Sequence, residues 1–184
     1  ILGIAGISGC GQKELLEAIA GLQVTESGHV YYIEDNGEKE ELLGKDPLAI
    51  AEMGVTLSFV PEDRLGMGLL GNMDLTDNML LRSFRKGHSL FTDKKEPKHL
   101  AEKVVDDLEV VTPSISTPVR KLSGGNVQKV LVGREIASAP TVLLTAYAVR
   151  GLDINSSYTI YELINEQKKK GVAVFAAILA VVIA

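Results

Sequence analysis

Leu122–Lys129 has the sequence Leu-Ser-Gly-Gly-Asn-Val-Gln-Lys, in which a hydroxyl residue and two glycines open a helix-forming segment. Ser123 is suited to cap the N-terminus of that helix, because its side-chain oxygen can accept a hydrogen bond from a backbone N–H of the first turn. Gly124 and Gly125 let a ligand approach the backbone closely. The free N–H groups and the dipole of the helix favour an anion there. Taken alone, this signature segment is equally consistent with a capped surface helix.

A second glycine-rich segment, Gly6–Glu14, lies between an apolar run and a helical pattern. The run Ile1–Ala5 predicts a buried strand, and Gln12–Ala20 predicts a helix that ends at Gly21. The residues of this helix predicted to face inward are Leu15, Leu16 and Ile19. A strand, a glycine loop and a helix in this order are typical of a Walker A loop, whose backbone N–H groups surround nucleotide phosphates. A glycine turn without a ligand is the alternative.

This phosphate loop departs from the Walker A pattern G-x-x-x-x-G-K-[ST] at two positions, because Gln12 replaces the lysine and Lys13 replaces the hydroxyl residue. Lys13 is no substitute for the lysine, since one step along a helix turns a side chain by about 100°. A charge-assisted hydrogen bond contributes about 1.5–3 kcal/mol, so its loss predicts weakened nucleotide binding with the backbone cradle retained. The candidate nucleotide-binding residues are Gly6, Ser8, Gly9, Cys10, Gly11, Gln12, Lys13 and Glu14.

Strand and helix patterns alternate through most of the remaining chain. Buried strands are predicted over Val55–Val60 and Thr141–Ala146. A short helix is predicted to start at Pro47, and a longer one to cover Ser156–Lys170. This alternation predicts an α/β fold with a doubly wound parallel sheet.

Two segments lie outside the alternation. His29–Ile33 alternates like a strand and leads into the turn sequence Asp35–Gly37, which predicts a small antiparallel β flap. From residue 61 to 120 charges and glycines become more frequent, and helical patterns cover Asp74–Arg85 and Pro97–Val111. We expect an inserted α-helical subdomain over 61–120, between core segments 1–60 and 121–184.

Length and composition exclude several classes of protein. The 184 residues, 46% of them hydrophobic, fit one domain with a sizeable core. A net charge of −5 gives no basic field for phosphate backbones, so nucleic acid is not an expected partner. The single Cys10 cannot form an internal disulfide and the three histidines lack metal-ligand spacing. A reducing cytosolic setting and no structural metal are therefore expected.

Neither end of the sequence has the pattern of a targeting or membrane segment. Ile1–Ala5 lacks the charged region that begins a signal peptide. Val172–Ala184 is apolar throughout but shorter than the roughly 20 residues of a membrane-spanning helix. We expect it to form a buried parallel strand and an incomplete following segment, with the end of the domain missing.

The loop after the predicted strand Thr141–Ala146 completes a set of three motifs. Arg150–Asp153 has the sequence Arg-Gly-Leu-Asp and, together with the phosphate loop and the signature segment, resembles the ATP-binding domain of ABC-type ATPases. The resemblance implies a P-loop NTPase (RecA-like) fold, with a parallel sheet flanked by helices, and ATP as the ligand.

The resemblance also indicates that the chain's own ATP site is degenerate. Ala146 stands where the family has an Asp that supports magnesium, and Tyr147 where it has the catalytic Glu. Alanine has no oxygen to orient water around a metal, and a neutral phenol is a poor base for the attacking water. The histidine expected near the end of the following strand is absent from Val172–Ala180.

Phe59–Leu69 is similar to the Q-loop region of the second nucleotide-binding domain in simple-sugar and purine-nucleoside importers, where a Pro-Glu-Asp-Arg sequence replaces the usual Gln. Glu62 then takes the Q-loop position. Members of that family carry two such domains in one polypeptide, and the chain resembles the C-terminal, degenerate one. A solvated charged turn is the alternative interpretation of Glu62, Asp63 and Arg64.

The importer resemblance implies a head-to-tail pair of domains, in which each ATP lies between the phosphate loop of one domain and the signature of the other. The residues offered to the partner's site would be Ser123, Gly124, Gly125 and Gln128 of the signature and Asp153 of the D-loop. Magnesium would be bound weakly or through that site. Further implied partners are transmembrane permease subunits and, indirectly, a solute-binding protein, with the domain peripheral at the cytoplasmic face of the membrane. A helix cap is the alternative role of Asp153.

Three other functions compete with this interpretation. A P-loop kinase or GTPase would need the missing Walker lysine and has no use for the signature segment. A soluble ABC protein of translation or DNA repair is disfavoured by the low basicity and by Pro61–Arg64. A purely structural domain would no longer bind nucleotide. Whether the chain is itself an active enzyme is left open by the sequence.

Overall fold

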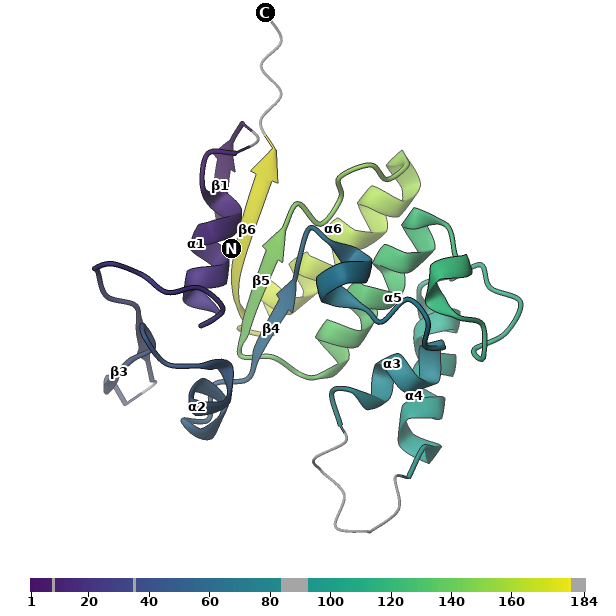
Figure 1. The fold of residues 1–184 in the computed structure, drawn as a ribbon, viewed down its shortest axis with the longest axis horizontal. Coiled ribbons are helices and arrows are strands. Elements are labelled where there is room, and N and C mark those ends of the chain that lie inside the picture. Colours follow the sequence, from purple (N-terminus) through teal and green to yellow (C-terminus); the bar gives the residue numbers. More distant parts are fainter. Residues whose placement is uncertain (8, 35, 84–92, 180–184) are drawn as a thin grey trace, which may run out of the picture.

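Four parallel strands form the main sheet, in the order β1-β6-β5-β4 (Figure 1). The computed structural model describes residues 1–7, 9–34, 36–83 and 93–179. The strands are β1 (Leu2–Gly6), β4 (Leu57–Val60), β5 (Val142–Ala146) and β6 (Ala173–Leu179). Each neighbouring pair is parallel, as the alternation of strands and helices predicts. All five residues of the inner strand β5 are buried, which is typical of an apolar strand covered on both faces.

Helices cover both faces of this sheet. Successive side chains of a strand point to opposite faces, so Leu143 and Leu144 of β5 enter two different cores. Leu144 packs in the core formed with α1 (Gln12–Ile19) and α2 (Pro47–Glu52), whereas Leu143 packs in the core formed with α5 (Gly124–Ala137) and α6 (Ile154–Lys169). The predicted doubly wound α/β arrangement is confirmed.

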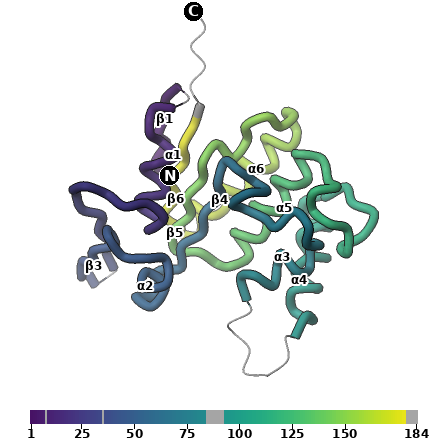
Figure 2. Tube along the Cα trace, in the orientation of Figure 1, coloured from purple at the N-terminus to yellow at the C-terminus, as the bar shows by residue number. Residues whose placement is uncertain are grey.

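The small flap is also present. Strands β2 (Tyr31–Ile33) and β3 (Lys39–Glu41) pair antiparallel, and their ribbon lies beside α2, at the edge of the molecule nearest α1 (Figure 2). Asp35, in the predicted turn, lies outside the described residues.

Helices and helical turns recur through the described part of residues 61–120. These residues contain a π-helical turn η1 (Arg64–Gly68), α3 (Leu75–Leu80), α4 (Lys95–Asp107) and a 3₁₀ turn η3 (Val119–Lys121). Leu75 and Met79 of α3 and Val104 of α4 belong to the same hydrophobic core as α5 and α6. The helical segment is therefore packed continuously onto the sheet through α5. Among the described residues, no helix is both long and apolar enough to cross a membrane.

Several predictions need correction. The strand predicted over Ile1–Ala5 is present as β1, but the prediction that it is buried is wrong, since Leu2 is 55% exposed. The helix predicted over Asp74–Arg85 ends at Leu80 as α3, and Arg85 lies outside the described residues. The helix predicted over Pro97–Val111 begins at Lys95 and ends at Asp107, because Glu109 adopts a positive φ of 49° that breaks the helix. The prediction that Leu15 faces inward is wrong: it is 47% exposed, since Leu16 alone of that pair faces the sheet.

Candidate nucleotide-binding and signature site

The phosphate loop connects β1 to α1 with the backbone shape that its glycines predict. Gly9 and Gly11 have φ values of 83° and 89°, in the left-handed region that side chains disfavour. A Cβ atom built at either glycine would meet nothing within 4 Å, so the space beside the loop is open. Gly11 is the N-cap of α1, and no side chain caps this helix. Cys10 is exposed, and Ser8 lies outside the described residues.

Gln12 lies across the inside of this loop, in the place where the Walker pattern has a lysine. Its side chain is only 4% exposed, and Nε2 donates a hydrogen bond to the Ile7 carbonyl at 3.4 Å. A Cβ atom on Gly6 would lie 2.1 Å from that Nε2, so the amide packs directly against the glycine. Oε1 of Gln12 is buried and has no hydrogen-bond partner among the residues that the structure describes. A polar atom in this state indicates that a ligand, a water or a rearrangement completes the loop.

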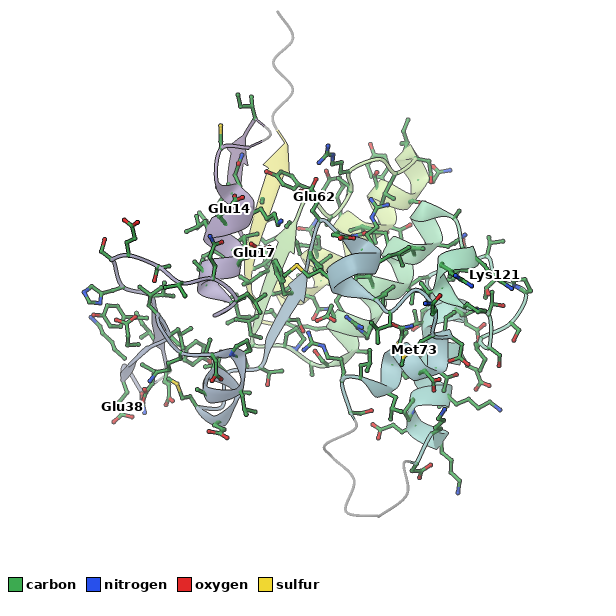
Figure 3. All side chains as sticks on the ribbon, viewed as in Figure 1. Glu14, Glu17, Glu38, Glu62, Met73 and Lys121 are labelled. Carbon is green, nitrogen blue, oxygen red and sulfur yellow. The ribbon has the colours of Figure 1, made fainter. Side chains whose placement is uncertain are left out.

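Lys13 does not compensate for the missing lysine. Its ammonium group lies 3.6 Å from the carboxylate of Glu17, one turn further along α1. Figure 3 shows Glu14 and Glu17 following one another along this helix. Lys13 is thus engaged along the flank of α1, as expected from the rotation of about 100° between neighbouring helical residues.

The end of β5 supplies no catalytic carboxylate. Ala146 is fully buried, and Tyr147 is 8% exposed with a backbone φ of 53°. The backbone N–H of Tyr147 donates to the Ala177 carbonyl at 3.1 Å, which ties it to β6. No group of three or more His, Cys, Asp or Glu residues that could hold a metal ion occurs in the part of the chain that the structure describes. Neither Ala146 nor Tyr147 carries a carboxylate that could support a magnesium ion at the end of this strand.

The signature segment forms a well-capped helix start. The Ser123 hydroxyl accepts hydrogen bonds from the backbone N–H and the side-chain amide of Asn126, at 3.4 and 2.9 Å, as predicted for an N-cap. Ser123 and Gly124 are exposed. Gln128 is 1% exposed, and neither atom of its amide has a hydrogen-bond partner within the described part of the chain. The structure therefore separates Gln128, in the interior, from the exposed start of α5.

Asp153 begins α6 beside this helix start. Its carboxylate accepts hydrogen bonds from the backbone N–H of Ser156 at 2.9 Å and from the Ser156 hydroxyl at 2.7 Å, so the helix-cap role is confirmed. These two hydrogen bonds, the backbone one first, lower the pKa of the Asp153 carboxyl. A Cβ atom on Gly125 would lie 3.3 Å from the Ser156 oxygen and 3.7 Å from Asp153 Oδ2. The two helix starts are therefore in close contact.

The loop after β4 reaches both of these segments. Glu62 lies at the end of the sheet toward which β4, β5 and β6 point, and it forms an ion pair with Arg150 (Figure 3). Arg64 donates one hydrogen bond to the Gly124 carbonyl at 3.3 Å and another to the Arg150 carbonyl. Asp63 caps η1 by accepting from the backbone N–H of Gly66 at 2.8 Å. Glu62 and Arg64 thus make side-chain contacts outside their own turn, whereas Asp63 bonds within it.

Sequence reasoning missed Arg150 and Ser156 as members of this cluster. A signal for Arg150 existed, because β4 and β5 are parallel neighbours and residues that follow their carboxyl ends meet at the same edge of the sheet. An acid shortly after β4 and a base shortly after β5 are thus expected to pair. Ser156 gave no comparable signal, since its contact with Gly125 depends on how closely α5 and α6 pack.

A buried ion cluster lies on α5 away from the helix start. Glu135 is fully buried and forms ion pairs with Arg82 and with Arg134, the latter at 2.8 Å. Arg134 also donates to the Gly68 carbonyl at 2.7 Å. Burial, and secondarily the charge of Arg82, lowers the pKa of Arg134 to about 10. This cluster joins α5 to the ends of α3 and η1.

Residues 1–145 match the family model of the ABC transporter. The chain belongs to this family. It is 37% identical over 177 residues to the guanosine import ATP-binding protein NupO of Bacillus subtilis, and 35% identical over 175 residues to the xylose import ATP-binding protein XylG of Moorella thermoacetica. Each alignment covers 95% of the chain and 33% of the relative, so the chain spans about a third of the length of these proteins.

Solved ABC cassettes have the same fold. A dimeric structure of the ATP-binding cassette MJ0796, in a post-hydrolysis state bound to ADP and Pi, superposes with a TM-score of 0.78 at 22% identity, covering 96% of the chain and 73% of that cassette. A nucleotide-free cassette from an ABC transporter superposes with a TM-score of 0.72 over the same share of the chain and 69% of its own length. The predicted P-loop NTPase architecture, a parallel sheet flanked by helices with a small antiparallel flap, is confirmed.

Proposed function

We propose that the chain is the degenerate nucleotide-binding domain of an ABC importer for a sugar or nucleoside, and that it offers its signature to the site of a partner domain. The relatives that support an importer are named for the import of guanosine, xylose and galactose. The observation that carries the degenerate assignment is the contrast between the two glycine loops. Gln12 fills the phosphate loop, while the start of α5 is capped and exposed.

In this function the partner domain supplies the phosphate loop, the magnesium support and the catalytic base of the working site. Ser123 and the N–H groups of Gly124 and Gly125 face the terminal phosphate of that ATP, where a helix N-terminus stabilises the charge that develops during phosphoryl transfer. Asp153 lies beside them as the D-loop residue, and Glu62 occupies the Q-loop position. The chain's own loop contributes Gly6, Gly9 and Gly11 to a second, weaker nucleotide site.

The assembly that follows places two cassettes head to tail beneath transmembrane permease subunits, at the cytoplasmic face of the membrane. A solute-binding protein reaches the chain only indirectly, through those subunits. A soluble ABC protein acting in translation or DNA repair is the alternative assembly, and it is disfavoured by the importer relatives. Affinity capture of permease subunits, as opposed to ribosomes or DNA, distinguishes the two.

Nucleotide binding and phosphate release by the chain alone test the degenerate assignment. We expect phosphate release near background, because Ala146 and Tyr147 provide neither metal support nor a base. Magnesium-dependent turnover that Gly11→Asp abolishes would come from the chain's own loop and contradicts this assignment. A domain that does not bind nucleotide is the second candidate function. It is favoured by the position of the Gln12 side chain inside the phosphate loop. Calorimetry with ATP separates them, since only the first predicts a measurable heat of binding.

A further inference from the structure

Arg64 joins two segments that are far apart in the sequence. One N–H group of its guanidinium donates to the carbonyl of Gly124, the first residue of α5, at 3.3 Å, and a second donates to the carbonyl of Arg150, in the loop after β5. A planar guanidinium can satisfy two carbonyl groups at fixed relative positions, which a lysine ammonium does less specifically. Arg64 therefore sets the distance between the start of α5 and this loop.

Glu62 adds a second connection from the same loop. Its carboxylate pairs with the guanidinium of Arg150, whose carbonyl is already bound by Arg64. Arg150 is thus held both by its side chain and by its backbone. These contacts lie around a pocket of about 400 Å³, which is lined by Glu62, Arg64 and Gly124 among others. A displacement of the loop 61–64 is transmitted to the other two segments.

The first turn of α5 has little freedom between its neighbours. A Cβ atom on Gly124 would lie 3.2 Å from the Arg64 guanidinium, and one on Gly125 would lie 3.3 Å from the Ser156 oxygen. The rest of α5 is held separately by fully buried residues such as Val130 and Leu131. Loss of Arg64 should therefore loosen the first turn of α5 while the helix and the core remain folded.

We propose that Arg64 is a positioning residue that fixes the Ser123–Gly125 turn against the loop Tyr147–Asp153, so that the backbone N–H groups of the turn are held in the geometry needed by the partner's ATP. This inference rests on the proposed function of the signature. The residue acts through the backbone of Gly124 and Arg150 and does not itself contact nucleotide. Preorganised donors stabilise a transition state because they need no rearrangement during the reaction.

The test measures ATP turnover of the assembled transporter with substitutions in this domain. Arg64→Gln should lower kcat about tenfold, as expected from loss of hydrogen bonds made by a charged group, with the KM for ATP unchanged. Arg64→Lys should retain part of the activity, because the ammonium can still bind one carbonyl. Arg120→Gln, which removes an exposed arginine four positions before Gly124, is the matched control and should leave kcat unchanged.

Amide hydrogen exchange on the chain supplies a second measurement. Arg64→Gln should speed exchange at Asn126 and Val127, whose N–H groups donate to Ser123, by about tenfold, while exchange along α4 and the midpoint of urea unfolding stay unchanged. Accelerated exchange throughout the chain, or a lowered midpoint, means that Arg64 serves general stability and overturns the inference.

Gly125→Asp distinguishes failure of this inference from failure of the proposed function. If Gly125→Asp abolishes turnover and Arg64→Gln leaves kcat unchanged, the positioning role is wrong while signature donation stands. If neither substitution affects turnover, the signature does not serve the partner's site and both proposals are wrong.

Discussion

The phosphate loop and the signature segment are both glycine-rich starts of helices, and they differ in what fills the space around them. At the start of α1 the Gly6 side of the loop is covered by Gln12, whose Oε1 has no partner among the described residues, while the space beside Gly9 and Gly11 is open. At the start of α5 the neighbouring side chains stand behind the helix: Ser123 caps it, and Arg64 binds the Gly124 carbonyl.

This contrast shows that the backbone shape of an anion site and the side chains that would bind or hydrolyse the anion are separate properties. The phosphate loop keeps its shape, since Gly9 and Gly11 hold the left-handed backbone that the loop requires. Gln12 stands at its Walker lysine position, and Ala146 and Tyr147 follow at the end of β5, so the proposed function assigns it neither a cation for phosphate nor an acid and base for hydrolysis. In the same proposal the start of α5 needs only backbone N–H groups and a rigid support. Three substitution experiments test how far the two loops differ.

The largest expected effect concerns Gly125. In the assembled transporter, Gly125→Asp should reduce ATP turnover by at least about a hundredfold, because a carboxylate would face the phosphate and would stand beside Asp153. Gln12→Ala should change turnover by less than about twofold, since its loop serves the degenerate site. The measurement is steady-state phosphate release in the same preparation for both variants.

Gly125→Asn is the matched control for the size of the new side chain. A Cβ atom at this position would lie 3.3 Å from the Ser156 oxygen, so part of the loss of turnover is steric. The difference in turnover between the Asp and Asn variants measures the effect of the charge. Equal effects of Gly125→Asp and Gln12→Ala, or a larger effect of Gln12→Ala, would falsify the assignment of this domain as a signature donor.

A repaired phosphate loop should have a smaller and more selective effect. The double substitution Gln12→Lys with Lys13→Thr restores the Walker A pattern. We expect it to tighten ATP binding to the chain by roughly tenfold to a hundredfold, because it adds one charge-assisted hydrogen bond. Phosphate release should stay at background, because Ala146 and Tyr147 are unchanged. Calorimetry and a phosphate assay measure the two quantities separately.

Lys13→Thr alone is the control for this repair, because it alters the loop without adding the cation. Unchanged ATP affinity in the double variant means that the loop does not hold phosphate at all, which favours the purely structural alternative. A gain of turnover means instead that the end of β5 has been misinterpreted.

Local chemistry allowed much of the fold to be predicted from the sequence. The order strand, glycine loop, helix is fixed by adjacent residues, and so are the caps at Ser123 and Asp153. The buried run of β5 could also be predicted, because a strand covered on both faces is apolar at every position. The exposure of Leu15 could not, because the choice between Leu15 and Leu16 depends on how α1 is rotated against the sheet.

The motifs of the candidate site could be predicted from the sequence, but most of the side-chain contacts between them could not. Gln12 and Lys13 could be identified as departures from the Walker A pattern. The packing of the Gln12 amide against Gly6 could not be predicted, because it depends on the path of the loop. Arg64 and Arg150 are 86 positions apart, and nothing in their local sequence shows that one binds the carbonyl of the other. Such contacts arise from the parallel arrangement of β4 and β5 and from the packing of α5 on α6.

The smallest expected effect is a pH dependence of amide exchange near the start of α5, which we do not expect at the start of α1. Hydrogen bonds from Ser156 lower the pKa of Asp153, so the ionised carboxylate stabilises the folded state. A group with a lowered pKa contributes its full stabilisation above its unfolded value, about 3.9, and loses it as the pH falls through the lower folded value.

We therefore expect amide exchange at Ser156 and Val127, corrected for its intrinsic pH dependence, to become faster in the chain below about pH 4. Exchange at Leu15, whose N–H donates to the Gly11 carbonyl, should not change in the same way, because no described side chain caps α1. Asp153→Asn should remove this acid-dependent difference, since the amide cannot titrate. Glu102→Gln, on the exposed side of α4, removes a carboxylate elsewhere and should preserve it. If Leu15 and Val127 lose protection together on acidification, the carboxylate of Asp153 does not support the start of α5, and the contrast between the two helix starts rests on Arg64 and Ser123 alone.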